Sequence, residues 1–255
     1  MSYVDFAVEL AREAMALIRD SSGAPIETLH KSPGDFASAL DAHIESVLKQ
    51  RIAQRFPAHG FLGEEGGGNT SGDQPIWIVD PIDGSVNFVR GYPQYSVSIA
   101  LVHKGEPIAA CIADPCRGEV FSAAVGQGAY LNGQRIQVAG TARLDHAIAA
   151  TVFPKPNALL MDSYMARLDR VMRQVAGVRR AGSMALELAY LAAGRVDVFW
   201  ERGMGAWDAA AGVLLIREAG GVVFTLDNKP WMVSAEIAAA VPGLEGNWRN
   251  LLEEP

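Results

Sequence analysis

The segment at 77–88, which reads WIVDPIDGSVNF, constrains the fold of this chain more than any other stretch. It begins inside an apolar run of strand-forming residues at 76–79, and we expect this strand to end at Asp80. Pro81 follows, and its ring removes a main-chain donor and fixes φ at the end of the strand. Asp80 and Asp83, three positions apart, are therefore expected to leave one edge of a sheet together.

The residues between and beyond these two acids offer further polar groups. Ile82 can turn its side chain into the core and leave its carbonyl on the same side as the carboxylates. Gly84 and Ser85 follow where a helix could begin, and N–H groups at such a place bind phosphate oxygens. Oxygen ligands without sulfur or imidazole suit a hard cation such as Mg²⁺. The segment favours a cation and phosphate site; the alternative is a plain turn between two buried strands, because Asp-Pro and Asp-Gly both form turns.

Composition narrows the class of protein. The chain has 255 residues, 49% of them hydrophobic, which is enough for one large domain or two closely packed ones. A net charge of −7 and the lack of a basic cluster argue against nucleic acid as a partner. Cys111 and Cys116 are too few for a disulfide framework and indicate reduced thiols in the cytoplasm. We expect neither a signal peptide nor a membrane span, since no stretch approaches about 20 apolar residues.

Periodicity along the chain predicts two sheets flanked by helices. Strand-like runs at 96–102, 108–113 and 120–124, followed by the turn former Asn132-Gly133, predict an antiparallel sheet. Later strands are expected at 147–153, 196–200 and 222–224. Helices are expected at 4–18, 40–52, 159–175, 186–191, 207–218, 234–240 and 244–252. This alternation indicates a layered arrangement of helices and sheets.

Other charged residues stand where elements begin or end. Asp41 lies in the first turn of the second predicted helix, Glu64 follows a short strand, and Asp208 lies in the first turn of a late helix. Lys31 lies in a polar connection at 30–35. Taken singly, these residues have ordinary explanations, namely a carboxylate at a helix terminus, a charged hairpin tip and a solvated surface charge.

Five segments taken together carry a resemblance to a known family. They are FLGEE at 61–65, WIVDPIDGSVNF at 77–88, GQGAYLNG at 126–133, RAGS at 180–183 and WDAAAGVLLIREAGG at 207–221. In this order and spacing the chain resembles the inositol monophosphatase family, within the larger group of lithium-sensitive, Mg²⁺-dependent phosphatases. The resemblance implies an α+β fold of five alternating layers (αβαβα). It also implies one catalytic domain over 1–255, with a metal-binding half at about 1–140 and a smaller α/β substrate-binding half at about 141–255, and usually a homodimer.

The resemblance also assigns roles to residues of this chain. Catalysis would fall to Asp41 and Ser85, which would activate water, and to Glu64. Lys31 would lie in a mobile loop over the metals, and Glu201 would hydrogen-bond a sugar or inositol hydroxyl. The ligands of two or three Mg²⁺ ions would be Glu64, Asp80, the Ile82 carbonyl, Asp83 and Asp208. The substrate contacts would be Ile82, Asp83, Gly84, Ser85, Gly182, Ser183, Met184, Glu201 and Asp208.

The implied reaction is hydrolysis of a small phosphate monoester, with inositol 1-phosphate as the first substrate to test. Such esters hydrolyse very slowly because the anionic phosphoryl group repels hydroxide, and bound cations offset that repulsion. Histidinol phosphate and fructose 1,6-bisphosphate are the alternatives on the same scaffold, and a non-catalytic phosphate-binding interaction module is a more distant one. Ser38 and Ser85 depart from the family, which usually has Thr there. Arg202 is an unusual cation that either recognises a second anionic group or has a surface role.

Overall fold

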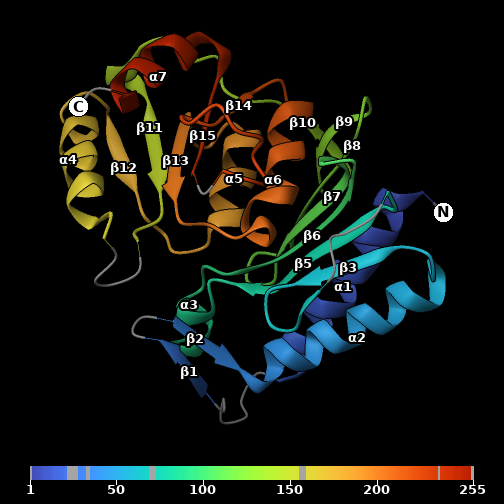
Figure 1. Cartoon of the computed structure of the whole chain (residues 1–255). Helices are drawn as coiled ribbons and strands as arrows, with labels where there is room; N and C mark the ends of the chain where they lie inside the picture. The colour runs from blue at the N-terminus through green and yellow to red at the C-terminus, as the bar shows by residue number, and fades with distance from the viewer. Residues whose placement is uncertain are drawn as a thin grey trace.

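The structure is a computed structural model that describes residues 2–21, 28–32, 35–68, 73–154, 159–234 and 236–253, with the backbone alone for 28–32 and 35–37. Figure 1 shows the helices in groups that cover the faces of two sheets. The α-helices in the described ranges are α1 (Tyr3–Asp20), α2 (Ala39–Arg55), α3 (Ser85–Val89), α4 (Met161–Met172), α5 (Met184–Ala192), α6 (Ala206–Glu218) and α7 (Glu245–Glu253).

The larger sheet has eight strands in the order β10-β9-β8-β7-β6-β5-β3-β4. Neighbouring strands are antiparallel except for the parallel pair β3 and β5. This confirms the antiparallel sheet expected from the sequence. The strands are β3 (Gly60–Gly63), β4 (Gly67–Gly68), β5 (Ile76–Asp83), β6 (Ser96–His103), β7 (Glu106–Asp114), β8 (Glu119–Ala124), β9 (Gly128–Leu131) and β10 (Gln134–Ile136).

The smaller sheet has five strands in the order β12-β11-β13-β15-β14. Here β11 runs parallel to β12 and β13, whereas β15 is antiparallel to β13 and β14. The strands are β11 (Ile148–Thr151), β12 (Gly177–Arg179), β13 (Val198–Arg202), β14 (Val222–Phe224) and β15 (Glu236–Ala240). A separate hairpin joins β1 (Thr28–Ser32) to β2 (Asp35–Ser38).

Alternation along the strands divides the interior into separate apolar clusters. In β5, Ile76 and Ile78 face α5 and α6, whereas Trp77 and Val79 face α1 and α2. Successive side chains of a strand point to opposite faces, so a strand buried on both faces must be apolar throughout. The run at 76–79 meets this requirement, which explains why β5 lies inside the sheet.

The same alternation in β13 adds the last layer. Phe199 faces the helices between the sheets, whereas Val198 and Trp200 pack against α4 and α7. The order of layers is therefore α1 and α2, the eight-stranded sheet, α5 and α6, the five-stranded sheet, then α4 and α7 (Figure 1). The expected αβαβα fold is confirmed. No helix in the described ranges is long and apolar enough to cross a membrane.

Three local expectations differ from the structure. The helix expected at 234–240 is wrong, because Glu236–Ala240 form strand β15. Alanines favour a helix intrinsically, but here they are buried between β13 and β14, and pairing in the sheet outweighs propensity. Strand β5 does not stop at Asp80 but continues to Asp83 after a register shift. Of the connection expected at 30–35, residues 30–32 belong to strand β1 and Asp35 to strand β2, and 33–34 lie outside the described residues.

Candidate active site

A cleft of about 580 Å³ opens where the ends of the two sheets approach each other, and both halves of the chain line it. The first half contributes Glu64, the end of β5 and the start of α3. The second half contributes the end of β13, the start of α6 and the segments that follow β11, β12 and β13. The lining residues are Glu64, Asp80, Asp83, Gly84, Ser85, Val86, Asn87, Val152, Phe153, Pro154, Met161, Arg180, Gly182, Met184, Glu201, Arg202, Gly203, Met204 and Asp208.

Three acids converge at the base of this cleft. One carboxylate oxygen from each of Asp80, Asp83 and Asp208 lies within 4.8 Å of the other two. Asp80 and Asp83 come from the last residues of β5, and both are buried. Asp208 comes from the first turn of α6, where its Oδ2 accepts a hydrogen bond from the Gly205 N–H at 2.6 Å. Segments more than 120 positions apart therefore supply one cluster of oxygen ligands.

Burial and mutual repulsion both act against the ionised form of the acids in this cluster. Burial raises the pKa of Asp80 well above its usual range, and the neighbouring Glu64, Asp83 and Asp208 raise it further. Burial also raises the pKa of Asp83, although its hydrogen bonds oppose this shift. A cation among these oxygens would favour the ionised acids and remove the repulsion between them. The donor set consists of carboxylates and fits a hard divalent cation.

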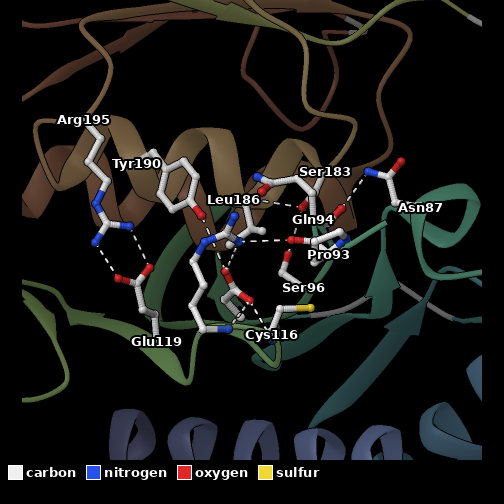
Figure 2. A network of polar contacts seen from close by, with 12 residues as sticks. Asn87, Pro93, Gln94, Ser96, Cys116, Glu119, Ser183, Leu186, Tyr190 and Arg195 are labelled. Carbon is white, nitrogen blue, oxygen red and sulfur yellow. Dashed lines mark hydrogen bonds and ion pairs between the residues drawn. The ribbon is translucent and has the colours of Figure 1, made fainter. Parts of the chain in front are cut away.

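Asp83 is fixed by four donors, three of which come from the second half of the chain. Its carboxylate accepts hydrogen bonds from the Ser183 hydroxyl at 2.5 Å, the Ala185 N–H at 2.8 Å, the Met184 N–H at 3.2 Å and the Ser96 hydroxyl at 3.2 Å. The Ser96 and Ser183 hydroxyls also lie 3.2 Å from each other, and Figure 2 shows the two residues side by side. Ser183, expected to contact substrate, is fully buried behind the cleft and bound to Asp83.

The turn between β5 and α3 has the expected form. The Ile82 side chain is fully buried, and its carbonyl accepts a hydrogen bond from the Ser85 hydroxyl at 3.1 Å. Gly84 has φ of +91°, a left-handed conformation that favours glycine. A Cβ there would also lie 3.0 Å from the Gly182 carbonyl oxygen. The chain thus passes closely under the loop from the second half before α3 begins at Ser85.

Asp41 lies behind the cleft at the start of α2. Its Oδ2 accepts hydrogen bonds from the Ser38 N–H, at 2.9 Å, and from the Ser38 hydroxyl. Its Oδ1 is buried and has no hydrogen-bond partner among the described residues. Burial raises the pKa of Asp41, and its charge in turn raises the pKa of Asp80. A buried acceptor without a partner is costly, so this oxygen fits a water or cation held at the site.

The wall from the second half carries a buried carboxylate and two arginines. Glu201 is buried, its Oε2 accepts the Val152 N–H at 3.0 Å, and burial raises its pKa well above the usual range. The Arg180 guanidinium lies 5.0 Å from the centre of the Phe153 ring. Arg202 lies 3.6 Å from Glu236 and donates to the Ser163 hydroxyl at 3.2 Å. The Lys31 side chain falls outside the described part of the chain.

Two polar residues at this site were missed in the sequence. Asn87 donates to the Gln94 carbonyl at 2.7 Å and the Ala181 carbonyl at 2.8 Å, which joins the two halves; Figure 2 shows its amide beside Gln94. Glu45 is buried under the turn that carries Glu64. Its place four residues after Asp41, on the same helical face, was a signal that could have revealed it.

Comparison with known proteins places this cleft in a described family. The model of the inositol monophosphatase family matches residues 1–253. A Pseudomonas aeruginosa protein named Nus factor SuhB is 40% identical in an alignment of 231 residues that covers 86% of this chain and 84% of that protein. An inositol-1-monophosphatase of Mesorhizobium japonicum is 42% identical over 224 residues, 88% of this chain and 84% of that one. The crystal structure of the extragenic suppressor protein suhB from Bartonella henselae superposes with a TM-score of 0.93 at 35% identity and covers 99% of both chains.

Proposed function

The chain belongs to the inositol monophosphatase family, and from this premise we propose that it hydrolyses inositol 1-phosphate or a similar polyol or sugar phosphate, with Mg²⁺ as cofactor. Membership of the family makes the chain a phosphatase, a hydrolase of phosphoric monoesters. The observation that supports the proposal most is the cluster of Asp80, Asp83 and Asp208 at the base of a cleft large enough for a small phosphate ester.

The cluster supports a cation site that this chain can build from its own oxygens. Glu64 lines the same cleft, and its charge raises the pKa of Asp80 more than the charge of any other neighbouring acid does. When bound, Mg²⁺ supplies positive charge that offsets the repulsion between phosphate and nucleophile and makes water a better nucleophile. We propose that the ions, two or three in number, are held by Glu64, Asp80, the Ile82 carbonyl, Asp83 and Asp208.

Other residues would bind and orient the reactants. We assign phosphate binding to the N–H groups of Gly84 and Ser85 at the start of α3. The unpartnered Oδ1 of Asp41 would accept a proton from the attacking water, and the Ser85 hydroxyl would orient that water. Glu201 would bind a hydroxyl of the leaving alcohol, together with Gly182 and Met184, which line the same wall.

A panel of phosphate esters tests this proposal. Orthophosphate release is measured from inositol 1-phosphate, histidinol phosphate, fructose 1,6-bisphosphate and phenyl phosphate, and kcat/KM is compared. We expect inositol 1-phosphate to be preferred, activity to disappear after treatment with a chelator, and Mg²⁺ to restore it. A strong preference for histidinol phosphate would refute the assigned substrate, and full activity after chelation would refute the metal.

The location, oligomeric state and partners of the protein are further parts of the proposal. We propose a cytoplasmic, lithium-sensitive homodimer without a nucleic-acid or membrane partner. Its relatives include proteins named Nus factor SuhB as well as inositol-1-monophosphatase, so the relatives' names leave the substrate open. The division into halves at about residue 140 likewise stays a prediction, as does the role of Lys31.

A further inference from the structure

Glu45 is a buried carboxylate that contacts the turn carrying Glu64. It lies on α2, and only 5% of the residue is exposed. Its Oε2 accepts a hydrogen bond from the Glu65 N–H at 2.9 Å, and its Oε1 accepts one from the Gly66 N–H at 2.8 Å. Each carboxylate oxygen therefore holds a different peptide of the turn between β3 and β4, and both peptides directly follow Glu64.

The two flanking glycines show how closely the carboxylate approaches this turn. A Cβ at Gly63 would lie 2.2 Å from the Glu45 Oε2, and a Cβ at Gly66 would lie 2.7 Å from its Oε1. Neither distance is compatible with an unshifted side chain at these positions. Glycines at 63 and 66 thus let the main chain close around the carboxylate, and no water fits between them.

The turn is held on both sides of Glu64. On one side the Glu64 N–H donates to the Val79 carbonyl of β5 at 3.2 Å, one residue before Asp80. On the other side are the two bonds to Glu45. The helix that supplies Glu45 is itself fixed, because Ile44 and Leu48 are fully buried in the core under the sheet. These main-chain contacts therefore fix the backbone from which the Glu64 side chain projects.

We propose that Glu45 is a positioning residue for the cation site, which it serves by holding Glu64 in the direction required of a ligand without touching the ion itself. This inference rests on the proposed function, in which Glu64 binds Mg²⁺ with Asp80, Asp83 and Asp208. Groups that orient metal ligands in this way commonly change metal affinity by about 10- to 100-fold when they are altered.

The substitution Glu45→Gln separates positioning from packing. Glutamine has nearly the same size and fills the same space, so a packing role would tolerate it. Its amide has a single oxygen, which can accept from only one of the two N–H groups, while its NH₂ group faces the other donor. The turn then loses one charge-assisted hydrogen bond, and the glutamine NH₂ group and a main-chain N–H, both donors, face each other without an acceptor.

The matched control is Glu218→Gln. The Glu218 carboxylate holds two peptides in the same manner, with Oε1 accepting the Gly126 N–H at 2.8 Å and Oε2 the Gly128 N–H at 2.7 Å. It lies at the last residue of α6, ten residues beyond Asp208, which is about 15 Å along the helix axis. This substitution repeats the chemical change at a place that does not line the cleft.

Two measurements test the inference. Hydrogen exchange in the metal-free protein follows the amides of Glu65 and Gly66, which should exchange at least about tenfold faster in Glu45→Gln. Titration with Mg²⁺ alone, followed by the rise in Tm, should require about tenfold more Mg²⁺ in Glu45→Gln than in the wild type. Glu218→Gln should change neither the exchange rates of the Glu65 and Gly66 amides nor the Mg²⁺ concentration that raises Tm.

Unchanged Mg²⁺ dependence in a folded Glu45→Gln protein would overturn the inference, and so would an equal shift in Glu218→Gln. If Glu45→Gln fails to fold, Gly66→Ala carries the test, because its methyl group would displace the carboxylate, and Gly246→Ala, where a Cβ meets nothing within 4 Å, is its control. Neither readout needs a substrate. Failure of the substrate panel would therefore refute the proposed activity alone.

Discussion

The two walls of the cleft are built differently. On the acidic side, Asp83 accepts four hydrogen bonds, and Glu45 holds the turn after Glu64 at two peptides. On the opposite wall, Arg180 is exposed and lies over the ring of Phe153, which is itself 44% exposed. The reacting end is thus fixed by contacts between distant segments, whereas the outer wall has room to change. Substrate preference should be easier to alter than the chemistry.

The largest effect should come from the acidic side. We expect Asp83→Asn to reduce turnover about a thousandfold for every phosphate ester, because a ligand worth several kcal/mol of charge stabilisation is lost. Steady-state kinetics at saturating Mg²⁺ measures this. Asp114→Asn is the control, since Asp114 is also fully buried and accepts the Cys116 and Arg117 N–H groups, but it does not line the cleft. Its turnover should persist; equal losses in both variants would contradict the role of Asp83.

A pH effect on stability should come from beneath the outer wall. Glu187 is buried and accepts the Ala181 N–H at 3.1 Å, and burial raises its pKa from 4.5 to about 7. The folded protein then keeps a proton that the unfolded chain releases near pH 4.5, so the free energy of unfolding falls as pH rises from about 4.5 to 7. The difference between these two pKa values corresponds to about 3 kcal/mol of stability.

Urea denaturation of the metal-free protein at pH 5 and pH 8 measures this contribution. The Glu187→Gln variant carries no titrating group at this position, so its stability should fall less over the same interval. Identical pH dependence in the two proteins would show that the Glu187 carboxyl does not titrate in this range.

A smaller, selective effect should come from Glu201. We expect Glu201→Ala to raise KM for inositol 1-phosphate about tenfold through loss of a hydrogen bond to a substrate hydroxyl. Phenyl phosphate, which has no such hydroxyl, should keep its KM within about twofold. Glu236→Ala on the neighbouring strand is the control, since Glu236 does not line the cleft. An equal rise in KM for both substrates would contradict this role, because it would show that Glu201 does not act through a hydroxyl of the substrate.

The smallest effect should come from Arg202. Its guanidinium already contacts Glu236 and Ser163, and binding a phosphate would require it to give up these contacts. We expect Arg202→Ala to change the preference between fructose 1,6-bisphosphate and inositol 1-phosphate less than about threefold. A selective loss of tenfold or more for the bisphosphate would instead assign Arg202 to a second phosphate.

Much of the acidic side could be predicted because its signals are local. The apolar run before Asp80, the glycine at 84 and the helix starts at Asp41 and Asp208 are each readable within a few residues. Local signals failed to predict structure where the contacts of a residue come from segments that are distant in the sequence. The alanines at 238–240 form a strand because two other strands pair with them, and Ser183 binds Asp83, 100 positions away.

The amino-acid sequence by itself determined the family, the layered fold and the identity of the acids, since strand alternation, helix caps and turn residues act over short distances. Only the tertiary structure decided which peptide N–H groups each carboxylate accepts and which acids meet in the cleft. Glu45, Asp83 and Glu187 have the same functional group as the exposed acids. Their partners lie 6 to 102 positions away and meet them only after the sheets and helices have packed.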